Sequence, residues 1–155
     1  ERLRALAQQT AARPRVMLNT PYRDTWFMPA RNSYMVRLLE DAGARYVFEE
    51  NTATQTLPID IEQAYYLTSK SDFWLNVSGC NTLDEVRRQN PRLADTPPVR
   101  EGRVYDNNRR RNAAGGSDFW ESGVLRPDRV LADLVHIFHP ELSETDELYY
   151  YRQLE

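Results

Sequence analysis

The 155-residue chain has little of three residue types that carry much of protein chemistry: one cysteine, two histidines and six glycines. Cys80 stands alone, which excludes a disulfide within the chain. His136 and His139 lie three residues apart at the end of a predicted helix, and no cysteine, aspartate or third histidine completes a zinc-site spacing. We therefore expect no metal site and no resident cofactor, and we interpret both histidines as caps of that helix end.

The motifs of phosphate and acyl-transfer chemistry are also missing. Gly115-Gly116 precedes no long helix and lacks the third glycine of a dinucleotide-binding loop. No Gly-x-Ser-x-Gly elbow is present, so the common serine-hydrolase arrangement is excluded. The sequence therefore gives little support to a catalytic function.

Charge and hydropathy exclude two further classes. No apolar run approaches the roughly 20 residues that a membrane-spanning helix needs. The net charge of −3 argues against a general nucleic-acid binder, although 19 of the 20 basic residues are arginine. With 41% hydrophobic and 28% charged residues, the composition is typical of one globular domain.

Strand-like and helical segments alternate along the chain. The predicted strands cover residues 15–19, 44–48, 72–77 and 103–106, and the predicted helices cover residues 3–12, 33–42, 60–68, 83–89 and 127–138. Alternation of this kind requires crossover connections, which place helices on both faces of a parallel sheet. The sequence therefore predicts an α/β fold with three layers and a mainly parallel central sheet, of the Rossmann-like type.

The helix at residues 127–138 has the clearest boundaries. Pro127 suits a first helical turn, and Pro140 ends the run. One apolar face at helical spacing contains Val130, Leu131, Leu134, Val135 and Phe138. We expect this helix to pack on the core, with the preceding residues 118–126 forming the end of an anchored loop.

Two other helices carry start and stop signals. Asn32 or Ser33 is expected to cap the second helix, and Gly43 supplies its stop. Pro58-Ile59 is expected to lead into the third helix, where Asp60 and Gln63 have capping-box spacing. The predicted inner faces contain Met35, Leu38, Leu39 and Ala42 in the second helix, and Ile61, Ala64, Tyr65 and Thr68 in the third.

In a parallel sheet, ligands bind beyond the carboxyl ends of the strands. The loops expected at that edge are residues 20–28, 52–58, 77–80 and 107–120. Their apolar candidates are Tyr22, Trp26, Phe27, Met28, Phe119 and Trp120, and their polar candidates are Asn107, Asn108, Arg109 and Asp118. For any single aromatic residue, packing of its loop on the core is the commoner role. The set as a whole favours a small-molecule site, an apolar wall with a few polar anchors.

Several segments in order resemble one known family. They are Pro21 to Phe48 with Trp26 and Ser33, Leu57 to Glu62, Asp72 to Asn76, Arg103 to Tyr105, and Asp118-Phe-Trp120 leading to Leu-Arg-Pro-Asp128. Together they resemble the carboxy-terminal lobe of class III periplasmic substrate-binding proteins of ABC importers, which serve the import of iron siderophores, haem and cobalamin. The resemblance covers nearly the whole chain.

The resemblance implies two α/β lobes joined by a long helix, with the ligand held between them. Residues 1–12 would be the end of that connecting helix, residues 13–155 the carboxy-terminal lobe, and the amino-terminal lobe would be absent from this chain. The residues implied or selected as ligand contacts are Trp26, Phe27, Met28, Leu57, Asn107, Arg109, Asp118 and Trp120. Their flat aromatic surfaces suit a macrocycle or an aromatic iron chelate.

The same resemblance implies a membrane partner. Glu62 matches a glutamate at a helix start that docks onto arginines of the permease, although the helix dipole alone also favours an acidic residue there. The implied location is the periplasm or the outer face of the cytoplasmic membrane, with peripheral or lipid-anchored association through the missing amino terminus.

Two other functions stay open at the level of sequence. A small α/β enzyme would use the same strand-end loops, where Asp24, Asp118 and Glu121 are the available acids, without histidine or lysine. A ligand-sensing domain built on the same lobe would need no docking glutamate.

Overall fold

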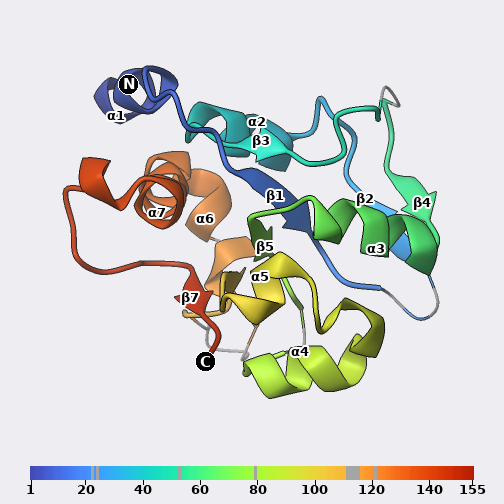
Figure 1. The fold of residues 1–155 in the computed structure, drawn as a ribbon. Helices are drawn as coiled ribbons and strands as arrows, with labels where there is room; N and C mark the ends of the chain where they lie inside the picture. Colours follow the sequence, from blue (N-terminus) through green and yellow to red (C-terminus); the bar gives the residue numbers. More distant parts are fainter. Residues whose placement is uncertain (22, 24, 52–53, 79, 111–115, 121) are drawn as a thin grey trace.

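The computed structural model describes residues 1–21, 23, 25–51, 54–78, 80–110, 116–120 and 122–155, and the side chain of Asp118 lies outside this description. A five-stranded sheet with the order β3-β1-β5-β6-β7 forms the centre of the described chain (Figure 1). Its strands are β1 (Arg15–Leu18), β3 (Arg45–Tyr46), β5 (Phe73–Leu75), β6 (Val104–Asp106) and β7 (Arg152–Gln153). The first four are parallel and β7 is antiparallel to β6, which confirms the mainly parallel sheet.

Two groups of helices flank this sheet, as the three-layer prediction requires (Figure 1). One group packs around α7 (Pro127–Phe138) and contains α1 (Arg2–Gln8), α2 (Tyr34–Asp41) and α6 (Ser122–Leu125). The other contains α3 (Ile61–Ser69), α4 (Leu83–Gln89) and α5 (Pro97–Arg100). Short 3-10 turns are η1 (Pro91–Leu93), η2 (Asp118–Trp120) and η3 (Pro140–Leu142). No helix of the described residues has the length and apolar character needed to cross a membrane.

The helix boundaries follow the capping chemistry of the sequence. Ser33 accepts a hydrogen bond from the backbone N–H of Val36, and Asp60 accepts one from that of Gln63. Gly43 has a φ of +83° directly after α2, a conformation that glycine adopts without steric cost. The structure thus confirms Ser33 and Asp60 as caps and Gly43 as the stop signal.

The predicted bounds and packed face of α7 are both confirmed. The helix runs from Pro127 to Phe138. The other predicted face residues, Val130, Leu134 and Val135, are buried with Phe138, and Leu131 is half-buried against the core.

A second, two-stranded sheet corrects the predicted loop at residues 20–28. Within it, β2 (Trp26–Met28) pairs antiparallel with β4 (Leu57–Ile59), so Pro58-Ile59 belongs to a strand and not to the entry of α3. Each strand has only three residues and finds its partner some thirty residues away. Local sequence patterns do not report such a pairing, because its hydrogen bonds come from a distant segment.

The packed side of α3 also differs from the prediction. Ala64 and Thr68 are buried as expected, and Leu67 is buried beside them. Ile61 and Tyr65 are exposed. The apolar stripe of α3 is therefore narrower than the sequence suggested.

Two tryptophans hold the carboxyl end of β1. The rings of Trp26 and Trp74 stack with their centroids 5.7 Å apart. Their indole N–H groups donate to consecutive carbonyls, Trp26 to Leu18 at 3.1 Å and Trp74 to Asn19 at 2.8 Å. Two large buried side chains thereby fix the carboxyl end of β1, the edge of the sheet where a ligand is expected to bind.

Candidate functional site

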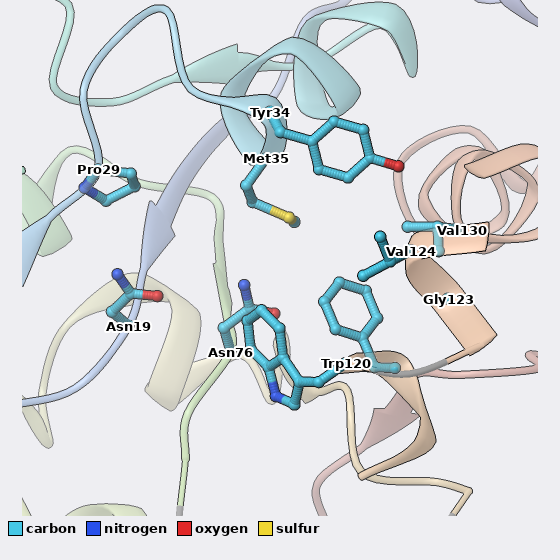
Figure 2. Close-up of a pocket in the computed structure, with 10 residues that line it drawn as sticks. Asn19, Pro29, Tyr34, Met35, Asn76, Trp120, Gly123, Val124 and Val130 are labelled. Carbon is cyan, nitrogen blue, oxygen red and sulfur yellow. The ribbon is translucent and has the colours of Figure 1, made fainter. Parts of the chain in front are cut away.

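An apolar cavity of about 190 Å³ lies where β1 and β5 end (Figure 2). Segments far apart in the sequence meet there: the two strand ends, the start of α2, η2, α6 and the start of α7. The described residues that line it are Asn19, Pro29, Tyr34, Met35, Asn76, Phe119, Trp120, Gly123, Val124 and Val130. The position agrees with the expectation that ligands bind at the carboxyl edge of the parallel sheet.

Aromatic rings form much of the cavity wall. Phe119 is buried, and Trp120 packs edge-on against it with ring centroids 4.9 Å apart. Trp120 itself is 64% exposed, and Tyr34 across the opening is 52% exposed. Large apolar rings left open to solvent beside a cavity are typical of a binding surface.

Two asparagines form the polar part of the cavity. Leu18 and Leu75 are register partners in neighbouring strands, so Asn19 and Asn76 follow side by side. Both have left-handed backbone conformations, with φ values of 72° and 63°. Asparagine tolerates this conformation better than most residues, and here it ends both strands and turns the side chains into the cavity.

Each asparagine amide is oriented by a hydrogen bond. Asn19 donates from Nδ2 to the carbonyl of Phe27 at 3.1 Å. Asn76 accepts at Oδ1 from the hydroxyl of Tyr151 at 2.8 Å. These bonds occupy the nitrogen of one amide and the oxygen of the other.

A buried carboxylate holds the segment that carries Tyr151. Asp133 of α7 accepts the backbone N–H groups of Tyr149, Tyr150 and Tyr151 at 2.8, 2.6 and 2.9 Å. Burial, and secondarily the negative charges of Asp106 and Asp133, raise the pKa of Tyr151 well above its usual value. The Tyr151 phenol is therefore neutral and able to donate at physiological pH.

Of the predicted ligand contacts, the structure brings Trp120 to the cavity. Trp26 and Met28, which were expected to contact the ligand, are instead buried in the core, 2% and 0% exposed. The alternation of β2 explains this, because Phe27 points to the opposite face and is 41% exposed. Asp118 begins η2, but its side chain lies outside the described structure, as do Tyr22, Asp24 and Glu121.

The other predicted contacts lie elsewhere. Arg109 is turned toward the C-terminal segment, where its guanidinium donates to the carbonyl of Leu148 and lies 3.8 Å from the Glu147 carboxylate. Leu57 is half-buried in β4 against the core. Asn107 is buried, and its carbonyl accepts from the hydroxyl of Ser117 at 2.5 Å. None of these three lines the cavity.

Glu62 occupies the surface position expected of it. It lies in the first turn of α3 with its side chain 67% exposed, and a carboxylate oxygen lies 2.5 Å from a guanidinium nitrogen of Arg92. An exposed ion pair of this kind contributes little to stability, about 0–1 kcal/mol. Glu62 is therefore accessible to a basic partner.

The two histidines connect separate parts of the chain. His139 is the C-cap residue of α7, as predicted, and its backbone N–H donates to the carbonyl of Val135. Its buried ring has Nε2 3.0 Å from the carbonyl of Gly43, at the end of α2. His136 places Nδ1 2.9 Å from the hydroxyl of Ser143. Among the described residues, no group of three or more histidine, cysteine, aspartate or glutamate side chains has a metal-binding arrangement.

Sequence reasoning missed Asn19, Asn76, Tyr34 and Met35 as site residues. One signal was present for the asparagines: each directly follows an apolar strand, in Val-Met-Leu-Asn19 and Phe-Trp-Leu-Asn76. Asparagine is suited to the left-handed turn that ends a strand, and this pattern marks the carboxyl edge of the sheet.

Comparisons with known proteins identify the family and the fold of this chain. A family model described as periplasmic binding protein matches residues 1–109. An uncharacterised lipoprotein of Methanocaldococcus jannaschii is 27% identical over 131 residues, which are 83% of this chain and 30% of that protein. The matched family consists of binding proteins and not of enzymes.

Two solved structures share the fold. A TroA-like periplasmic binding protein, FepB, from Veillonella parvula superposes with a TM-score of 0.68 at 14% identity, over 99% of this chain and 52% of that one. The periplasmic haem-binding protein RhuT from Roseiflexus superposes with a TM-score of 0.63 at 19% identity, over 92% of this chain and 52% of that one. The chain thus spans about half the length of these structures.

Proposed function

Because the chain belongs to the periplasmic binding protein family, we propose that it is the ligand-binding lobe of the substrate-binding component of an ABC importer. The observation that carries the proposal is the apolar cavity at the carboxyl edge of the sheet, with the exposed ring of Trp120 at its opening. The cargo is an iron chelate, haem or cobalamin, whose flat or apolar surface stacks on Trp120 and fills the cavity.

The lobe assignment rests on the apolar surface around the cavity. The exposed fractions of four apolar side chains are between 52% and 80%: Tyr34, Trp120, Val124 and Leu125. The surface of a monomeric soluble protein rarely exposes so many large apolar side chains next to one another. In the proposed protein, residues 1–12 end the helix that joins the lobes, residues 13–155 form the carboxy-terminal lobe, and cargo plus an amino-terminal lobe cover this surface.

Cargo binding is tested on the full-length protein by tryptophan-fluorescence titration with haemin, cyanocobalamin and a ferric siderophore. We expect saturable quenching by one of the three, because Trp120 lies at the cavity mouth. Absence of saturable binding by all three contradicts the proposed cargo and favours a sensor of another ligand.

Glu62 is the proposed contact to the permease. A first-turn carboxylate on an exposed helix can exchange its intramolecular Arg92 partner for an arginine of another protein. We expect Glu62→Gln to reduce uptake of cargo by cells without changing cargo affinity, and the exposed Glu101→Gln to leave both unchanged. Equal uptake by both variants contradicts docking through Glu62.

This function places the protein outside the cytoplasmic membrane, in the periplasm or on the membrane's outer face. A lipid anchor attached ahead of residue 1 is consistent with the matched relative, which is named a lipoprotein. Metabolic labelling of the full-length protein with a fatty-acid analogue tests the anchor directly.

A further inference from the structure

We propose that Asn19 and Asn76 form an amide-recognition pair that selects cargo carrying an uncharged carboxamide group, and that discriminates against a carboxylate in the same place. This inference rests on the proposed function, because it names the hydrogen-bonding groups by which the cavity recognises its cargo. The observation behind it is that each of the two side-chain amides has one polar atom without a hydrogen-bond partner among the described residues.

The two asparagines offer complementary groups to the cavity. Asn19 uses its Nδ2 to bond Phe27, and its Oδ1 has no hydrogen-bond partner in the described part of the chain. Asn76 uses its Oδ1 to accept from Tyr151, and its Nδ2 likewise has no partner among the residues described. One free acceptor and one free donor therefore stand side by side, and a carboxamide supplies the matching N–H and carbonyl.

The orientation of both amides is fixed before any ligand arrives. Figure 2 shows the side-chain oxygen of Asn19 directed toward the space enclosed by the lining residues, and the side-chain nitrogen of Asn76 directed toward Met35. The backbone carbonyl of Asn19 accepts a hydrogen bond from the indole N–H of Trp74, which fixes the residue's backbone, and Asn76 is 8% exposed. A preorganised pair of this kind loses little conformational entropy on binding.

The electrostatic setting favours a neutral ligand group. None of the lining residues that the structure describes carries a charge. A carboxylate placed against Asn19 Oδ1 would meet an acceptor and would lose its hydration without a counter-charge, which is costly in an apolar site. A carboxamide of the same shape avoids both penalties.

Three small probes of the same shape isolate this recognition: benzamide, acetophenone and benzoate. Each has a ring for the apolar wall; acetophenone keeps the carbonyl but lacks the N–H, and benzoate adds the charge. Affinities are measured by ligand-observed NMR titration of the full-length protein. We expect benzamide to bind about fivefold or more tightly than either analogue, as one neutral hydrogen bond allows.

Three variants assign the effect to the pair. Asn19→Gly and Asn76→Gly remove one amide each while tolerating the positive φ, and Asn32→Gly changes an exposed asparagine outside the cavity. We expect Asn19→Gly to abolish the preference for benzamide over acetophenone. Asn76→Gly should lower the affinity for both of these probes, and Asn32→Gly should leave all three affinities unchanged. Asn76→Asp keeps an acceptor for Tyr151 and removes the donor, so it provides a second test if Asn76→Gly unfolds.

The inference is overturned if benzamide does not bind, if the wild-type protein binds the three probes equally or prefers benzoate, or if both glycine variants keep the wild-type preference. Failure of the proposed function has a different signature. If cargo binds and Trp120→Ala weakens it while the probes show no amide preference, the transport role stands and only the amide pair is wrong. If no cargo binds, the transport role itself is wrong.

Discussion

The phenol of Tyr151 donates a 2.8 Å hydrogen bond to Oδ1 of Asn76, across 75 residues of sequence. Tyr151 is fully buried, and its backbone N–H is held by Asp133 of α7. The C-terminal segment therefore reaches the floor of the cavity and sets the direction of one of its two amides. The same hydrogen bond therefore contributes to stability and orients a side chain of the cavity, so both unfolding and ligand-binding measurements can test it.

Tyr151→Phe is expected to lower the free energy of unfolding by about 1–3 kcal/mol, because it leaves the buried Oδ1 of Asn76 without its donor. Cargo affinity should fall as well, since the Asn76 amide is then free to turn. Chemical denaturation and fluorescence titration measure the two effects. Tyr149→Phe is the matched control, since its hydroxyl makes no hydrogen bond among the described residues. Equal stabilities of the two variants would contradict the role given to Tyr151.

Stability is expected to decline at alkaline pH. Burial raises the pKa values of Tyr46 and Tyr151 above those of exposed tyrosine, so the folded state binds these protons more tightly than the unfolded state. The contribution is complete below the unfolded pKa of about 10 and is lost as the pH rises toward the folded values. Denaturation midpoints measured on both sides of pH 10 should therefore fall with pH, and less steeply in Tyr151→Phe. A midpoint independent of pH would show that neither phenol is protected.

Asp133→Asn is expected to destabilise the protein by about 3 kcal/mol or more. The carboxylate accepts three backbone N–H groups, two of them in buried hydrogen bonds, and an amide in its place has one acceptor oxygen and no charge. Urea denaturation compares it with Asp146→Asn, an exposed change on the nearby loop that should have little effect. If the two variants unfold at the same urea concentration, the carboxylate does not hold the tyrosine segment.

Gly43→Ala should be clearly more destabilising than Gly102→Ala. Both glycines have positive φ, where an alanine costs about 1–2 kcal/mol. A Cβ on Gly43 would also lie 2.7 Å from Nε2 of His139 and 2.8 Å from the carbonyl of Ala7, whereas one on Gly102 meets nothing closer than 3.9 Å. Thermal unfolding of both variants separates the clash from the backbone strain. Equal losses of stability would mean that both His139 and the Ala7 carbonyl move away from the new Cβ at no energetic cost.

The parts of the fold that sequence predicted correctly are those encoded locally. Ser33 and Asp60 cap helices through residues three positions away, and Pro127 begins a helix whose apolar stripe repeats within its own length. The β2–β4 pairing and the antiparallel β7 depend on partners far along the chain. Their two- or three-residue strands are too short to show a period of their own.

The cavity lies at the edge of the sheet where the sequence predicted a site, but most of its lining residues were not among the predicted contacts. The strand-end rule indicated this edge, and Trp120 is the predicted ligand contact that lines the cavity. Trp26 and Phe27 could not be separated by sequence, because a shift of one residue in a strand exchanges the buried and exposed faces. Asn19 and Asn76 acquire their importance only when the register places two strand ends together.

Cargo is proposed to bind at the cavity beside Trp120, and dissociation constants of variants of the full-length protein test this placement. Isothermal titration calorimetry uses the cargo that the fluorescence titration identifies. Trp120→Ala should raise its dissociation constant at least about tenfold, which corresponds to ~1.4 kcal/mol of binding free energy. The control Tyr66→Ala removes an exposed ring on α3, away from the cavity lining, and should leave the wild-type affinity unchanged. A wild-type affinity in Trp120→Ala, or an equal loss in both variants, would contradict the placement of the site.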